Sequence, residues 1–144
     1  MDPLTQALAE KDWNAVLAQT LQQFDCPAGT LHRFEDGLLQ LVARQGIPDF
    51  LLPKISEIPV GKGMAGIAAE RRTPVQVCNL QTDESGVVRP GAKDTKMEGA
   101  LTVPVFRNGE LAGTLGIAKP VPYDFSPEEI SRLEEIAARI GAQL

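Results

Sequence analysis

Three glycines at the spacing of a nucleotide-binding loop are the residues of this sequence most suggestive of chemistry. Residues 61–66 are Gly-Lys-Gly-Met-Ala-Gly, the pattern with which a Rossmann unit turns from a strand into a helix around a pyrophosphate, and Asp83 follows near the usual distance of a ribose-binding carboxylate. Pro59, however, is a poor occupant of a central parallel strand. We therefore expect the glycines to shape a loop and to let a short helix pack closely. The free amides of that helix near Lys62 and Met64 could still hold an anionic group of a ligand.

Two cysteines, Cys26 and Cys78, are the only thiols of the chain. Cys78 ends a predicted strand, and its neighbours Val77 and Asn79 supply no base that would lower its pKa. We expect it to be buried and unreactive, although reduction of a small sulfoxide by Cys78 stays open as an alternative. Two cysteines so far apart also argue against a disulfide-stapled secreted domain or a cysteine-rich zinc site.

Other candidates for catalysis or metal binding are few. His32, the single histidine, lies on a predicted strand; it could ligate haem, but a lone strand histidine is more often a partly exposed structural residue. A set of loop carboxylates lacks a fixed partner carboxylate, a base or metal ligands, so we expect solvation and not acid–base catalysis. The set consists of Asp83, Glu84, Asp94 and Glu98. The sequence therefore predicts no metal, no cofactor and no catalytic residue.

The longest irregular segment, residues 80–98, is the best candidate for recognising a small molecule, because loops of this length inside compact domains are often functional. Folded over a sheet, it could aim polar side chains inward, beside a threonine that interrupts an otherwise apolar strand. Binding pockets combine apolar walls with a few convergent polar groups. The predicted ligand-binding residues are Met64, Val77, Arg89, Lys93, Thr95 and Thr102.

Helices are predicted at both ends of the chain, over residues 1–24 and 126–144. The first contains one apolar stripe at helical spacing, which consists of Trp13, Leu17, Leu21 and Phe24. The second begins with a capping box formed by Ser126 and Glu129, with proline at the first helical position.

Residues 28–119 are predicted to form a mainly antiparallel sheet between these helices. Asp36-Gly37 and Asn108-Gly109 favour the positive φ angles of tight hairpin turns. A loop with one inward-packed helical turn is expected over residues 46–57, and a short helix ends near Arg71. We expect the terminal helices to cover one face of the sheet and the central loops and short helix to leave a cleft on the other.

Length and composition fit a single domain over residues 1–144. The chain is 43% hydrophobic and 23% charged, which is ordinary globular usage with enough apolar side chains for a core. Its net charge of -5, with no basic cluster longer than Arg71-Arg72, disfavours nucleic acid and anionic membranes as partners. The first residues lack a signal-peptide pattern and no apolar stretch could span a membrane, so a cytoplasmic location is expected.

Motifs along most of the chain resemble the GAF domain family. Residues 58–68, Ile-Pro-Val-Gly-Lys-Gly-Met-Ala-Gly-Ile-Ala, resemble the family's entry to its central helix, and further motifs follow in the family's order. These are Thr73-Pro-Val-Gln-Val, Ala100-Leu-Thr-Val-Pro-Val, the Asn108-Gly109 turn, Leu111-Ala-Gly-Thr-Leu-Gly-Ile and Tyr123-Asp-Phe-Ser-Pro-Glu-Glu. The resemblance covers residues 17–144. It implies an α+β, PAS-like fold with a ligand pocket and, often, a homodimer through the terminal helices.

The same resemblance implies a sensory or regulatory domain that binds a small molecule and is not an enzyme. Free methionine sulfoxide reductases of the family carry their cysteines mainly in the long pocket loop, and residues 80–98 contain none. Bilin-binding members have a histidine after the attachment cysteine, whereas Asn79 follows Cys78 here. A signal would pass to a separate protein partner or through dimer rearrangement. Two alternatives stay open: a reductase that uses Cys78, and a ligand-free dimerisation module.

Overall fold

Two hairpins form the centre of the sheet in the computed structural model, which describes residues 2–88 and 90–144. The first joins β1 (Ala28–Glu35) to β2 (Leu38–Gln45) and the second joins β5 (Gly99–Arg107) to β6 (Glu110–Lys119). At the first turn the φ angles of Asp36 and Gly37 are 52° and 80°, and at the second those of Asn108 and Gly109 are 53° and 81°. Both turns thus have the positive φ angles that the sequence predicts.

The sheet has six strands in the order β3-β2-β1-β6-β5-β4. The short strands β3 (Glu57–Pro59) and β4 (Val75–Val77) form its two edges, and every pairing is antiparallel. Pro59 therefore lies on an edge strand, where a missing amide donor is tolerated. This α+β topology confirms the expected fold class and differs from the parallel sheet of a Rossmann unit.

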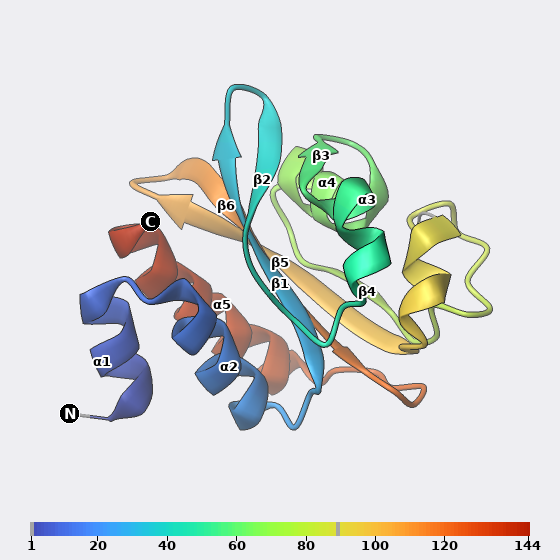
Figure 1. The fold of residues 1–144 in the computed structure, drawn as a ribbon, viewed down its shortest axis with the longest axis horizontal. Helices are drawn as coiled ribbons and strands as arrows, with labels where there is room; N and C mark the ends of the chain where they lie inside the picture. The colour runs from blue at the N-terminus through green and yellow to red at the C-terminus, as the bar shows by residue number, and fades with distance from the viewer. Residues whose placement is uncertain (1, 89) are drawn as a thin grey trace.

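Helices α2 (Trp13–Gln23) and α5 (Pro127–Gln143) cover one face of the sheet, as Figure 1 shows, and α1 (Pro3–Glu10) packs against both of them. The prediction of one helix over residues 1–24 is wrong. Lys11 ends α1 in the left-handed region at φ 54°, and Asp12 starts α2 by accepting a hydrogen bond of 3.2 Å from the amide of Ala15. At the other end, the capping box of Ser126 and Glu129 is present.

The alternation of side chains along the strands divides the sheet into two faces. Leu31, Leu115 and Val103, which lie opposite one another on three neighbouring strands, belong to the buried cluster with α1, α2 and α5. Residues one position along, such as Thr30 and Thr102, face the other way and line a cavity. The large core thus lies under the terminal helices and the second face is left for a site.

Short elements cover that second face: η1 (Asp49–Leu51), α3 (Leu52–Ile55), α4 (Gly63–Arg71) and η2 (Pro90–Thr95). In Figure 1 they lie on the side of the sheet away from α1, α2 and α5. The helical turn expected within residues 46–57 is present as η1 and α3, but only part of it packs inward. Leu51 is 2% exposed whereas Phe50 is 66% exposed. None of the helices described has the length and apolar character needed to cross a bilayer.

Candidate functional site

A cavity of about 360 Å³ lies between the second face of the sheet, α3, α4 and the segment around η2. This volume is in the range of small-molecule pockets. Most of its wall is apolar, and the apolar side chains are Ile47, Leu51, Ile55, Ile58, Met64, Ala65, Leu80, Val88 and Ala92. A ligand here would be largely surrounded by hydrocarbon, with polar contacts at a few fixed points.

The three glycines around the start of α4 have structural roles. Gly61 and Gly63 have φ angles of 91° and 65°, which residues with a Cβ rarely adopt. A Cβ on Gly66 would overlap the carbonyl oxygen of Pro59, so α4 can approach β3 only with glycine at this position. The structural interpretation of the Gly-x-Gly-x-x-Gly pattern is thus supported by each of its glycines.

The N-terminus of α4 opens onto the cavity. Gly63, Met64 and Ala65 are its first residues and all three line the cavity. The first amides of a helix have no acceptor within the helix and carry the positive end of its dipole. Lys62, the N-cap residue, has no side-chain acceptor for these amides and makes no capping bond. This end of the cavity is suited to an anionic group.

The charged side chains that line the cavity, among the described residues, have one sign. Lys54 and Lys62 line it, and no Asp or Glu does so among the described residues. Both lysines are exposed, so their ammonium groups remain hydrated and their attraction for an anion is moderate and screened by salt. They add to the field of the helix terminus instead of opposing it.

His32 forms part of the floor and is 1% exposed. Its Nε2 is 2.8 Å from the carbonyl oxygen of Ile55, which assigns the Nε2–H tautomer because only a ring N–H can donate to a carbonyl. Burial lowers the pKa of His32, and the bond to Ile55 opposes this effect only in part. The ring is therefore neutral near pH 7, and its buried Nδ1 has no hydrogen-bond partner among the described residues. The expectation of a partly exposed histidine is wrong.

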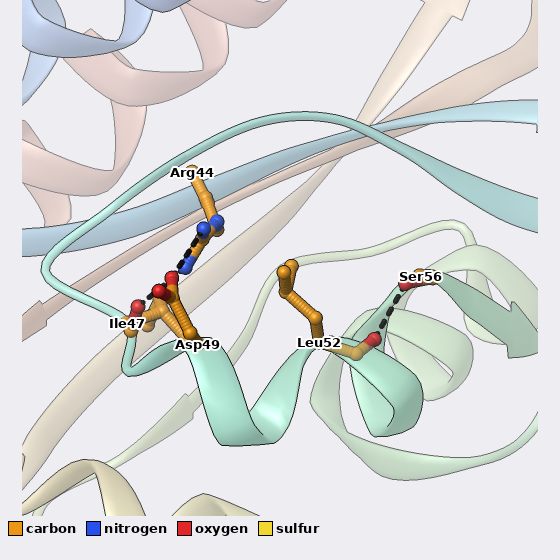
Figure 2. Close-up of polar contacts among 5 residues, drawn as sticks. All are labelled: Arg44, Ile47, Asp49, Leu52 and Ser56. Atoms are coloured by element: carbon orange, nitrogen blue, oxygen red, sulfur yellow. Dashed lines mark hydrogen bonds and ion pairs between the residues drawn. The ribbon is translucent and has the colours of Figure 1, made fainter.

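Arg44, at the end of β2, holds the segment that supplies Ile47 and Leu51 to the cavity wall. Figure 2 shows its guanidinium between the carbonyl oxygen of Ile47, at 2.8 Å, and the carboxylate of Asp49, at 2.6 Å. The Asp49 side chain is 88% exposed, so the ion pair contributes little free energy. The ion pair fixes where η1 begins. At the other end of this segment Ser56, just after α3, donates a hydrogen bond from its hydroxyl to the carbonyl of Leu52, the first residue of that helix.

One side chain makes two hydrogen bonds across the segment over the cavity. The amide nitrogen Nε2 of Gln81 donates to the carbonyl oxygens of Lys93 and Met97, at 3.1 and 2.8 Å. These two carbonyls lie near the end of η2 and just beyond it, so Gln81 ties the start of the long loop to its return. Thr95 turns the chain between them by donating to Ala92 and accepting from the amide of Met97.

The structure brings three of the six predicted ligand-binding residues to the cavity: Met64, Thr95 and Thr102. Val77 does not line it; it is buried in an adjoining apolar cluster with Leu80 and Ala100. Lys93 is exposed and contributes its carbonyl to the Gln81 contact. Arg89 lies outside the described residues.

Residues absent from the prediction complete the lining. Thr30 and His32 are two positions apart on β1, so their side chains project from the same face of the sheet, which also carries Thr102. Polar residues at every second position of this strand therefore indicate a polar part of that face. Lys54 had no such signal, because its position depends on how α3 folds back beside η2. A Cβ on Gly91 would lie 3.0 Å from the Lys54 Cδ, which shows how closely these two segments pass.

Neither cysteine lines the cavity. Cys26 is buried in the main core, and burial raises the pKa of its thiol to about 11. Cys78 is exposed, so the expectation that it is buried is wrong. The described residues also contain no group of three or more His, Cys, Asp or Glu placed to hold a metal ion.

The position and lining of this cavity can now be set beside known proteins. The family model for the GAF domain matches residues 12–144. The chain belongs to the GAF domain family. No curated protein matches its sequence.

Solved structures from different kinds of protein share this fold. The GAF domain from a phosphoenolpyruvate-protein phosphotransferase of Coxiella burnetii has a TM-score of 0.82 at 24% identity, covering 97% of this chain and 87% of its own. Its counterpart from Acinetobacter has a TM-score of 0.78 at 18% identity, over 97% and 89%. The free methionine-R-sulfoxide reductase of Neisseria meningitidis, solved with its substrate, has a TM-score of 0.76 at 21% identity, over 97% and 83%.

Proposed function

We propose that this GAF domain is a sensory or regulatory module that binds an anionic, largely apolar small molecule in the cavity between the sheet and α4. The observation that carries the proposal is the lining: apolar walls, Gly63 to Ala65 at the N-terminus of α4, and Lys54 and Lys62 without a lining carboxylate among the described residues. A carboxylate or phosphate at the helix terminus would find donors and positive potential together.

Binding would be transmitted through the segment over the cavity. This segment lines the cavity with Val88, Gly91, Ala92 and Thr95. A ligand would add apolar contacts to the segment, which Gln81 holds by two hydrogen bonds. A ligand shifts a conformational equilibrium only by its differential affinity for the two states. Ordering of residues 80–88 and 90–98 is the proposed difference between the two states. The signal would pass to a separate protein partner or to a second copy of the chain through the terminal helices.

The experiment is a thermal-shift and native mass spectrometry screen of small carboxylates and phosphates, with uncharged and cationic analogues beside them. A ligand that binds only the folded state raises Tm with its concentration. We expect anions alone to raise Tm and to appear as a bound mass, with a weaker effect in Lys62→Ala. Arg107→Ala removes the same charge from an exposed position away from the cavity and should leave the effect unchanged. A panel in which no anion binds would overturn the proposal.

A methionine sulfoxide reductase is the second candidate, favoured by the exposure of Cys78 and the likeness to reductase structures. Against it, Cys78 does not line the cavity, and the ammonium group of a free amino acid would meet two lysines and no carboxylate among the described lining residues. We therefore propose a domain that is not an enzyme. Reduction of free methionine-R-sulfoxide by the purified protein with dithiothreitol, abolished by Cys78→Ser, would replace this proposal.

A further inference from the structure

The floor of the cavity contains a row of three small residues on three neighbouring strands. In the sheet register Thr30 of β1 lies opposite Gly116 of β6, and Gly116 lies opposite Thr102 of β5. The two threonines line the main cavity, and all three residues line a smaller hollow of about 120 Å³ that continues from it. The side-chain positions of the row therefore project to the same space.

The two hydroxyls flank the space directly over Gly116, which has no side chain of its own. A Cβ built on Gly116 would lie 3.1 Å from Thr102 Oγ1 and 3.4 Å from Thr30 Oγ1. Each hydroxyl can donate one hydrogen bond. An atom seated over Gly116 that accepts two hydrogen bonds, as an oxygen does, would fit between them.

Neither backbone conformation nor backbone packing explains glycine at this position. Gly116 has no positive φ angle, and the atoms nearest to its added Cβ are the two hydroxyl oxygens. Gly113, on the same strand, is different: its Cβ would overlap the carbonyl oxygen of His32. Glycine inside a strand weakens the strand and often marks a close approach by a ligand. At Gly116 the space is limited by the two threonine side chains and by no backbone atom closer than 3.9 Å.

The group held there would be uncharged. No Asp, Glu, Lys or Arg is among the described residues that line the smaller hollow, whereas Lys54 and Lys62 line the main cavity. Thr95 also lines the hollow, but its hydroxyl is engaged with Ala92 and Met97. An ion placed in this hollow would lose hydration without gaining a counter-charge.

We propose that the hollow over Gly116 is a subsite in which Thr30 and Thr102 donate hydrogen bonds to an uncharged ligand oxygen, a ketone or hydroxyl, while the ligand's anionic group binds at α4. This assignment rests on the proposed function and narrows it to a class: oxyanions that carry a second, neutral oxygen. Threonine is also common in strands for steric reasons, so the test replaces the hydroxyls without changing the side-chain shape.

The test is an amide NMR titration of the labelled protein with straight-chain alkanoates of rising length. Each alkanoate is paired with its analogue bearing a ketone at the penultimate carbon. At the best chain length we expect the ketone to bind about tenfold more tightly, as one or two modest hydrogen bonds would give. Thr102→Val and Thr30→Val should each reduce this preference severalfold, and Gly116→Ala should abolish it. Thr73→Val, at an exposed position outside both lining sets, should keep the full preference.

The outcomes separate the subsite from the proposed function. Equal affinity for ketone and alkanoate at every length, with both perturbing the amides of Gly63 to Ala65, would overturn the subsite and leave the anion site standing. A ketone preference that persists in both valine variants would also overturn the subsite. If no alkanoate or ketone analogue binds, the anion site fails and the subsite fails with it. Thr30 is only half-buried, so its valine variant serves if Thr102→Val does not fold.

Discussion

The imidazole of His32 joins β1 to α3 through a hydrogen bond of 2.8 Å from its Nε2 to the carbonyl oxygen of Ile55. The two residues are 23 positions apart in the sequence. His32, buried and neutral, lies in the floor of the cavity, and its hydrogen bond holds Ile55 in the wall. Protonation of this ring would require a partner for Nδ1, and none is present among the described residues. The floor of the cavity thus requires His32 to be neutral.

The stability of the fold should depend on the pH at which His32 takes up a proton. Burial lowers its pKa below the ordinary 6.5, so between those two values the unfolded chain binds more protons than the folded one. We expect the free energy of unfolding to be highest above pH 6.5 and to fall as pH decreases from there towards the lowered pKa. Urea denaturation across this interval measures the effect.

His32→Gln is the control for that experiment, since the chain has a single histidine. The variant should be less stable than the parent near pH 7 but should have a flatter profile below it, until the carboxylates titrate. A parent profile that is level between pH 7 and pH 5.5, or a slope that His32→Gln retains, would mean that His32 is not the titrating group.

The two cysteines should differ sharply in reactivity. Cys78 is exposed, whereas Cys26 is buried and its pKa is raised to about 11, which leaves almost no thiolate at neutral pH. We expect an aromatic disulfide reagent to modify one thiol of the folded protein and both thiols in urea. Cys78→Ser should remove the fast reaction. Rapid modification of two thiols in the folded state would contradict the placement of Cys26.

The hydrogen bonds of Gln81 should control the segment over the cavity more than the fold as a whole. Gln81→Ala removes two bonds to the carbonyls of Lys93 and Met97, and we expect a loss of about 1 kcal/mol or less in stability, because one of them is at an exposed site. Amide exchange in residues 90–98 should increase, as local opening costs less. Gln22→Ala, at an exposed position on α2, should change neither, and an equal effect in both variants would refute this role.

Close packing of α4 on β3 predicts a contrast between two glycine substitutions. Gly66→Ala drives a Cβ into the backbone oxygen of Pro59, and we expect a loss of about 1–3 kcal/mol as α4 is displaced. Gly91→Ala meets only the flexible side chain of Lys54, at 3.0 Å, and should stay within about 0.5 kcal/mol of the parent. Equal destabilisation of the two variants, measured by urea denaturation, would contradict the close approach of α4 to β3.

Local chemistry explains what the sequence could predict. The hairpins at Asp36-Gly37 and Asn108-Gly109 and the capping box at Ser126 depend on residues that are neighbours in the chain, and all three are present. The break between α1 and α2 was missed because Lys11 adopts a left-handed conformation that its residue type does not favour.

The other wrong predictions concern Cys78, at the end of β4, and residues whose position depends on contacts between elements far apart in the chain. In β4 burial alternates from Val75 to Gln76 to Val77, and continuing the alternation places Cys78 outward, as observed. The place of Lys54 in the cavity wall depends on how α3 folds back beside η2, and no pattern of neighbouring residues reports that contact. The sequence thus predicts the loop, the short helix and Thr102 of the site, but not Thr30, His32 or Lys54.

The most direct test of the anion site is a crystal structure of the domain with the tightest-binding carboxylate or phosphate from the ligand screen. We expect the oxyanion within hydrogen-bond distance, about 2.7–3.2 Å, of the amides of Gly63, Met64 and Ala65, with the apolar part of the ligand in the cavity beside His32 and Thr102. An anion bound elsewhere on the surface, with the cavity filled by side chains that have moved inward, would contradict the proposed site.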